Sequence, residues 1–195
     1  MSALKHLNVA QTACFWGGDE AFATRILVIT GFAVLMAAGA QIDVPMHPVP
    51  MTLQSFAILL AGLCLGPRDG LLAVLIYLAA AAVGLPVLSE GSSGLGPFGG
   101  PTAGYIYAFP VAAFLAGVLA GRSVRRPALQ RPTVMVPALF GLHLVLLGVG
   151  TAWLSARIPL GEAVSGGFTP FLIGAGAKSL LCWAVWRGLS RLRRA

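Results

Sequence analysis

The sequence predicts an all-α integral membrane protein, a bundle of six transmembrane helices with both termini on the cytoplasmic side. Composition is the first reason: 57% of the 195 residues are hydrophobic and only 10% are charged, whereas a soluble domain carries about 25% charged residues. The second is a mean hydropathy of +0.87, with the apolar residues gathered in runs long enough to span a bilayer. The third is a strong asymmetry of Lys and Arg between alternate connections.

The first three predicted spans lie in the N-terminal half. The first, residues 22–40, ends at residues 41–50, where three prolines favour extended backbone and exclude a helix. The second, residues 51–65, ends at the sequence Gly-Pro-Arg-Asp over residues 66–69, which is typical of a tight turn. The third span follows directly, over residues 70–85.

A glycine-rich connection and three further spans complete the pattern. Residues 86–103 are too polar and too rich in glycine for a lipid-facing helix. They are also long for a connection in so short a chain, so they form either a functional loop or a disordered one. The fourth span, residues 104–121, contains Pro110, which predicts a kink. The fifth and sixth spans are residues 132–154 and 168–189.

The placement of the basic residues predicts the orientation. One set of ends and loops holds Lys5, Arg25, Arg68, Arg122, Arg125, Arg126, Arg131, Arg187, Arg191, Arg193 and Arg194. The opposite set holds only Arg157, so the first set is cytoplasmic. The net charge of +7 is therefore explained without a nucleic-acid partner. We expect a leader over residues 1–21, a membrane domain over 22–189 and a basic tail over 190–195.

Small residues at four-residue spacing let helices approach closely in lipid. Ala112, Ala116 and Ala120 form such a stripe in the fourth span, where internal packing is the favoured interpretation. Ala33 and Ala37 have the same spacing in the first span. For them, internal packing and a docking face for another membrane protein both stay open.

Lys178 is the most informative single residue, because it lies near the middle of the sixth span. A lysine there costs about 2.5–3.5 kcal/mol on insertion scales, so it faces a cavity, pairs with an anion or snorkels to the surface. The surrounding GAGAKS is not a phosphate-binding loop, because Ala177 stands where that motif requires glycine. The chain thus shows no ATP site of its own.

Other polar residues near the outer surface are candidate ligand contacts. Thr52 and Gln54 open the second span, where they either cap a helix or contact a polar ligand. Tyr105 follows the glycine-rich connection and Tyr77 lies within a span, where its hydroxyl needs a partner. No group of metal ligands and no catalytic set is visible, so we expect no metal, no cofactor and no enzyme activity.

Four motifs in order, VPMTLQ, LGPR, GLPV and GPTAGY, resemble the BioY family, the biotin-specific S components of energy-coupling-factor (ECF) vitamin transporters. The resemblance is strong over the second to fourth spans and weaker over the sixth. It implies a six-helix subunit of the bacterial cytoplasmic membrane that captures biotin from outside. It further implies a transmembrane coupling protein (T component), docked through an A-x-x-x-A motif that Ala33 and Ala37 fit, and two ATPase subunits. Some members of the family are thought to work without the full module.

The resemblance also implies a binding site beneath the outer loops. A lysine matching Lys178 ends the family's last-helix motif P-G-D-x-x-K, but Ala175 stands here in place of the aspartate. The biotin carboxylate alone then stabilises Lys178, or Glu90 substitutes for the missing acid. The candidate substrate-binding residues are Lys178, Gln54, Thr52, Tyr105, Tyr77, Ser89, Glu90, Gly100 and Thr102. The alternatives are an S component for another small vitamin and an assembly subunit without a ligand.

Overall fold

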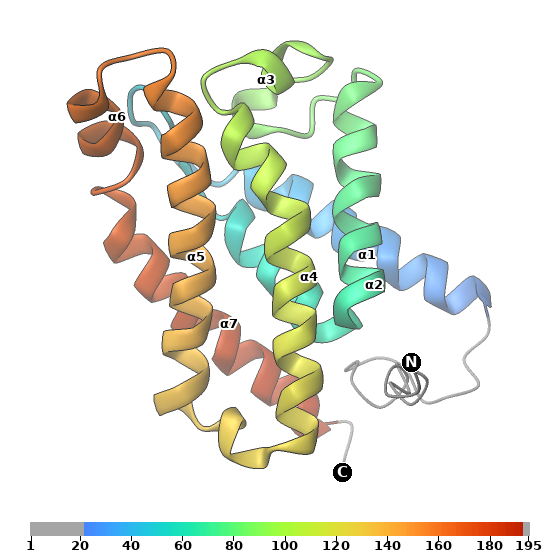
Figure 1. The fold of residues 1–195 in the computed structure, drawn as a ribbon. Helices are drawn as coiled ribbons and strands as arrows, with labels where there is room; N and C mark the ends of the chain where they lie inside the picture. Colours follow the sequence, from blue (N-terminus) through green and yellow to red (C-terminus); the bar gives the residue numbers. More distant parts are fainter. Residues whose placement is uncertain (1–21, 193–195) are drawn as a thin grey trace, which may run out of the picture.

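The computed structural model describes residues 22–192, which form a bundle of long helices running between two ends of the molecule (Figure 1). The expected leader over residues 1–21, with Lys5, lies outside the described residues, as do Arg193 and Arg194. The division into leader, membrane domain and tail therefore stays a prediction.

The long helices lie close to the predicted spans. They are α1 (Phe22–Ala40), α2 (Gln54–Ala82), α4 (Ala103–Arg125), α5 (Pro132–Ser155) and α7 (Phe171–Leu192). The shorter elements are β1 (Asp43–Val44), β2 (Met51–Thr52), η2 (Ser89–Gly91), α3 (Gly96–Gly99), η3 (Pro127–Gln130) and α6 (Leu160–Gly167). By length and apolar composition, five helical segments among the described residues can cross a membrane, with α2 counted once.

Helix α2 consists of two legs, because the chain reverses direction at Gly66 (Figure 1). Gly66 has φ 84° and ψ 179°, a backbone region that is accessible essentially only to glycine. Pro67 then begins the second leg with a fixed φ. The legs correspond to the second and third predicted spans, so the described chain makes six membrane legs. The predicted tight turn is confirmed.

The first leg of α2 is the centre of the bundle, and nearly all of its residues are buried. Helices α1, α4 and α7 pack against α2, and α5 packs against α4 and α7. The approach between α4 and the α2 turn is so close that a Cβ added at Gly117 would overlap the backbone of Gly66 and Pro67. Ala112, Ala116 and Ala120 are buried, which confirms the internal-packing interpretation of the fourth span.

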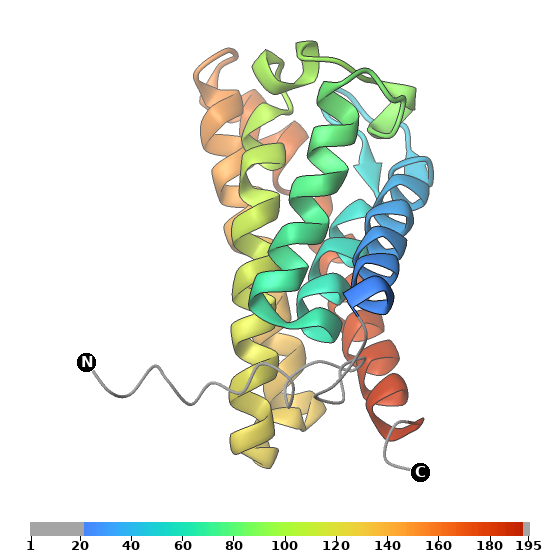
Figure 2. The ribbon, with the colours of Figure 1, turned by 90° about the vertical axis from the view of Figure 1, so that its right-hand side faces the viewer.

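The two ends of the bundle differ in structure and in charge. The hairpin region, the connection around α3, and α6 lie at one end, whereas the α2 turn and η3 lie at the other (Figures 1 and 2). The turn and η3 are where the predicted cytoplasmic arginines lie, including Arg68 and the cluster within residues 122–131. The geometry therefore agrees with the orientation that the Lys and Arg asymmetry predicts.

Two details differ from the sequence expectation. Residues 51–52 pair with residues 43–44 in a short antiparallel hairpin, so α2 begins only at Gln54. The short helix α6 was not predicted, and it delays the start of the last spanning helix to Phe171. Helix α4 includes Pro110 within its length, and the kink expected there stays a prediction.

The inner face of α1 contains both alanines that the resemblance assigned to partner docking. Ala33 is 6% exposed and Ala37 is partly buried against the core. In this arrangement the small residues let α1 pack closely on α2, and the docking role of the two alanines stays a prediction. The same helix is held to the α2 turn by a bidentate pair, in which the Arg25 guanidinium donates to both carboxylate oxygens of Asp69, at 2.5 and 3.0 Å.

Candidate functional site

A cavity of about 100 Å³ lies beneath the glycine-rich connection, between α2, α4, α5 and α7. One water needs about 10–15 Å³ of such space, so the cavity admits an organic ligand. Its lining residues are Val49, Pro50, Thr52, Gln54, Ser55, Leu88, Ser89, Ser92, Pro97, Thr102, Tyr105, Ile106, Phe109, His143, Leu146, Leu147, Phe171, Ala175 and Lys178. We call residues 86–102 the lid, because they close the cavity from the outer end.

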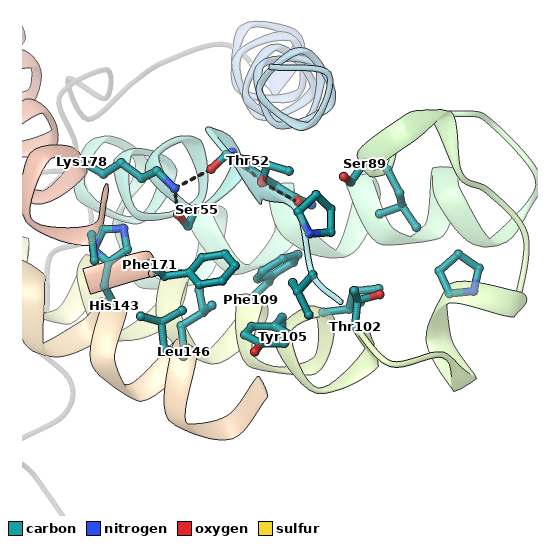
Figure 3. Close-up of a pocket in the computed structure, with 18 of the residues that line it drawn as sticks. Thr52, Ser55, Ser89, Thr102, Tyr105, Phe109, His143, Leu146, Phe171 and Lys178 are labelled. Atoms are coloured by element: carbon teal, nitrogen blue, oxygen red, sulfur yellow. Dashed lines mark hydrogen bonds between the residues drawn. The ribbon is translucent and has the colours of Figure 1, made fainter. Parts of the chain in front are cut away.

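The inner end of the cavity, farthest from the lid, is formed around Lys178 (Figure 3). Its Nζ donates to the backbone carbonyl of Thr52 and, at 3.3 Å, to the hydroxyl of Ser55. An ammonium has three hydrogens, so one stays available to a ligand. The described lining contains no acidic residue, so no carboxylate of the cavity wall neutralises the charge.

Gln54 is buried in the cavity wall, and two neighbours fix its orientation. Its Nε2 donates to the Tyr77 hydroxyl at 2.6 Å, and its Oε1 lies 3.4 Å from the Thr52 hydroxyl. Tyr77 in turn donates to the carbonyl of Val87 at 3.0 Å. Tyr77 is 1% exposed and does not line the cavity. Tyr77 was a candidate ligand contact from the sequence. In the structure it lies behind the cavity wall and positions Gln54 and the start of the lid.

Tyr105 lines the cavity with its ring, and its hydroxyl points elsewhere. The hydroxyl donates to the carbonyl of Gly167 at 2.7 Å and lies 3.3 Å from the Thr151 hydroxyl. The ring lies so close to Gly150 on α5 that an added Cβ there would overlap it. Tyr105 thus contributes an apolar wall, together with Phe109 and Phe171, while its hydroxyl is bonded away from the cavity.

The lid brings some of the predicted residues to the cavity and turns others away. Ser89 and Thr102 line the outer end (Figure 3), and the buried Ser89 Oγ has no partner among the described residues. Glu90 has φ 57° and is exposed outside the cavity, so it does not substitute for the missing acid beside Lys178. Gly100 lies outside the lining, and its carbonyl accepts the Trp153 indole N–H at 3.0 Å.

Several lining residues were not predicted, and His143 is the most polar of them. It is 3% exposed and lies at the inner end with Lys178 (Figure 3). A signal existed, since an ionisable residue inside an apolar span marks a functional site by default. Apolar lining residues such as Leu146 and Phe171 carried no such signal, because their composition is that of any spanning helix.

The cavity therefore suits an elongated ligand that is polar at both ends and apolar in the middle. The inner end offers an ammonium, a hydroxyl and an imidazole, and the outer end offers serine and threonine hydroxyls. Aromatic and aliphatic side chains form the walls between them. No group of three potential metal ligands occurs among residues 22–192.

Comparison with known proteins gives consistent results. A family model described as the BioY family matches residues 9–195. The "Probable biotin transporter BioY" of Pyrococcus horikoshii is 40% identical over 151 residues, which cover 77% of this chain and 86% of that protein. The "Biotin transporter BioY" of Rhizobium etli is 37% identical over 161 residues, which cover 79% and 83%.

A solved structure matches the fold as well. A crystal structure of the S-component for biotin from an ECF-type ABC transporter superposes with a TM-score of 0.68 at 28% identity. The match covers 89% of this chain and 92% of that one.

Proposed function

This chain belongs to the BioY family, and from that premise we propose that it binds biotin and takes part in biotin uptake as the substrate-specific subunit of an ECF-type transporter. The single observation that carries the assignment is Lys178, an ammonium at the inner end of a lidded cavity whose described lining holds no acid. An intramembrane charge without a protein counter-charge is costly unless a ligand or cavity compensates it.

Biotin matches the distribution of polar and apolar groups in the cavity. It has a ureido ring at one end, a carboxylate at the other, and a thioether ring with an aliphatic chain between them. Either polar group accepts a hydrogen bond from Lys178. Gln54, Ser89 and Thr102 offer further donors and acceptors, and the aromatic walls cover the apolar middle.

Energy for uptake comes from partners under this proposal. The GAGAKS segment lies within α7 and shows helical backbone instead of a phosphate-binding loop. We therefore assign the chain the role of a binding subunit that works with a membrane coupling protein and two ATPase subunits. It performs no chemical step on its ligand.

The test is isothermal titration of biotin into the purified chain in detergent, compared with the Lys178→Met variant. We expect submicromolar, saturable binding to the wild-type chain. The variant loses a charge-assisted hydrogen bond of about 1.5–3 kcal/mol, so affinity falls about tenfold to a hundredfold. Arg191→Met is the matched control, because it removes an exposed positive charge from the same helix and should bind normally.

Two outcomes would contradict the proposal. One is the absence of biotin binding at near-millimolar concentration, and the other is equal or tighter binding of a different vitamin in a parallel screen. Unchanged biotin affinity in Lys178→Met would remove the role of the lysine while leaving the ligand assignment in place.

A further inference from the structure

His143 has an unused hydrogen-bonding group at the inner end of the cavity. Its Nε2 is enclosed and has no hydrogen-bond partner among the described residues. Buried polar atoms are nearly always paired, so an unpaired one indicates a role that needs explanation. The Ser89 Oγ, likewise unpaired, belongs to the opposite end of the same cavity.

The other ring nitrogen is fully engaged, and its partners determine where the ring carries its hydrogen. Nδ1 lies 3.2 Å from the carbonyl oxygen of Leu139 and 3.0 Å from the Ser179 hydroxyl. The hydroxyl gives its single hydrogen to the carbonyl of Ala175 at 2.7 Å, so toward the ring it can only accept. A carbonyl oxygen also only accepts.

These contacts are satisfied together when Nδ1 carries the hydrogen and Nε2 carries a lone pair. A second ring hydrogen would place another positive charge beside Lys178, in a cavity whose described lining holds no acid. Two residues that line the inner end therefore carry a donor, the Lys178 ammonium, and an enclosed, unpaired acceptor, Nε2 of His143. This pair complements a ligand group in which N–H and C=O stand side by side.

We propose that Nε2 of His143 accepts a hydrogen bond from an N–H group of the bound ligand, which makes His143 a specificity-determining residue. The inference rests on the proposed function. In biotin only the ureido ring carries N–H groups, so the ring lies at the inner end, with its carbonyl oxygen accepting from Lys178. This assignment replaces the lysine–carboxylate pairing expected from sequence and turns the carboxylate toward the lid.

The assignment of His143 as the acceptor also accounts for the alanine at position 175, where the family motif has an aspartate. That residue lines the cavity, and an aspartate there would have supplied an acceptor at the inner end. Instead, the backbone carbonyl of Ala175 accepts from the Ser179 hydroxyl, and that hydroxyl orients the His143 imidazole on α5. The acceptor then comes from a different helix and is neutral.

The first test compares two substitutions by biotin titration. His143→Asn keeps a hydrogen-bonding group near the Nδ1 position and removes the one at Nε2, whereas His143→Gln reaches the Nε2 position with an amide oxygen. We expect about tenfold weaker binding for His143→Asn and substantially smaller loss for His143→Gln. Equal binding by wild type and His143→Asn overturns the inference and leaves the proposed function intact.

The second test needs no variant and is therefore independent of folding defects. In the 15N-histidine-labelled wild-type chain, the Nε2 resonance of His143 should show an unprotonated nitrogen that shifts when biotin saturates the protein. The two other histidines of the chain, His6 and His47, serve as internal references. A resonance that stays unchanged at saturation, or a hydrogen on Nε2, overturns the inference.

The orientation of the ligand has its own readout. If Lys178 meets the ureido carbonyl, Lys178→Met should weaken biotin and biotin methyl ester by the same factor. If it pairs with the carboxylate instead, the ester binds weakly to wild type and becomes insensitive to the substitution, which contradicts the orientation. If biotin itself does not bind the wild-type chain, the proposed function fails first.

Discussion

At the scale of single residues, the site depends on side chains that hold other side chains in place. Gln54 faces the cavity, but its amide is oriented by Tyr77, which no ligand reaches in this arrangement. Tyr105 uses its hydroxyl to tie α4 to Gly167 and offers only its ring to the cavity. Candidate residues are thus divided into those that contact a ligand and those that position them.

Tyr77→Phe tests the positioning role of the tyrosine hydroxyl. The substitution leaves the buried Gln54 amide without its 2.6 Å partner, at a cost of about 1–3 kcal/mol. We expect a lower thermal midpoint in detergent and weaker biotin binding. Tyr107→Phe is the control for the thermal midpoint, because that hydroxyl bonds the Phe98 carbonyl from a half-exposed position and should cost less stability. Equal effects of the two substitutions would contradict the assignment.

At the scale of elements, the lid is an ordered segment fastened along one edge. Three successive carbonyl oxygens accept from side chains of α4, of α5 and of the turn after α5: Phe98 from Tyr107, Gly99 from Arg157 and Gly100 from Trp153. The Arg157 guanidinium also lies 4.4 Å from the Trp153 ring centroid, a favourable cation–π contact. The glycine-rich composition that allowed either a functional or a disordered loop therefore forms a fastened cover.

Arg157→Met should loosen this edge of the lid without changing the cavity wall. It removes the 2.8 Å hydrogen bond to Gly99 and the contact with Trp153. We expect biotin to dissociate several-fold faster and amide hydrogens of the lid to exchange faster. Stopped-flow dissociation and hydrogen-exchange mass spectrometry measure the two effects. Unchanged dissociation, relative to Arg191→Met, would show that the lid opens elsewhere.

At the scale of the whole molecule, a single turn makes six membrane legs out of the five apolar helical segments of residues 22–192. Gly66 reverses the chain at the end opposite the lid, and α4 packs directly on this reversal. The first leg of α2 thereby lies in the middle of the bundle. Its outer end brings Gln54 and Ser55 to the cavity, where Lys178 of α7 donates to the Ser55 hydroxyl.

Gly66→Ala should destabilise the entire bundle. A side chain at φ 84° and ψ 179° costs about 1–3 kcal/mol, and the turn cannot relax because Gly117 of α4 approaches it closely. We expect lower yield and a lower thermal midpoint. Gly148→Ala on α5, where an added Cβ meets no atom within 4 Å, should leave the midpoint unchanged or slightly higher. A neutral Gly66→Ala would show that the turn adopts another conformation.

The sequence by itself determined the fold class, the six spans, their orientation and the importance of Lys178. These properties depend on hydropathy and charge counted over short stretches of the sequence. The length of an apolar run decides whether it spans a membrane, and the Lys and Arg residues of a loop decide on which side it lies. The motifs added the family, and with it a ligand. Both signals can be read along the chain without knowledge of how the helices are rotated.

Only the tertiary structure decided which side chains meet. The convergence of His143 with Lys178, the outward turn of Glu90, the hydroxyl of Tyr105 directed at Gly167 and the inward face of Ala33 all depend on helix rotation. Rotation is set by close packing, as where Gly117 admits the α2 turn, and such contacts join residues far apart in the chain. Hydropathy cannot distinguish the faces of a helix that is apolar all round.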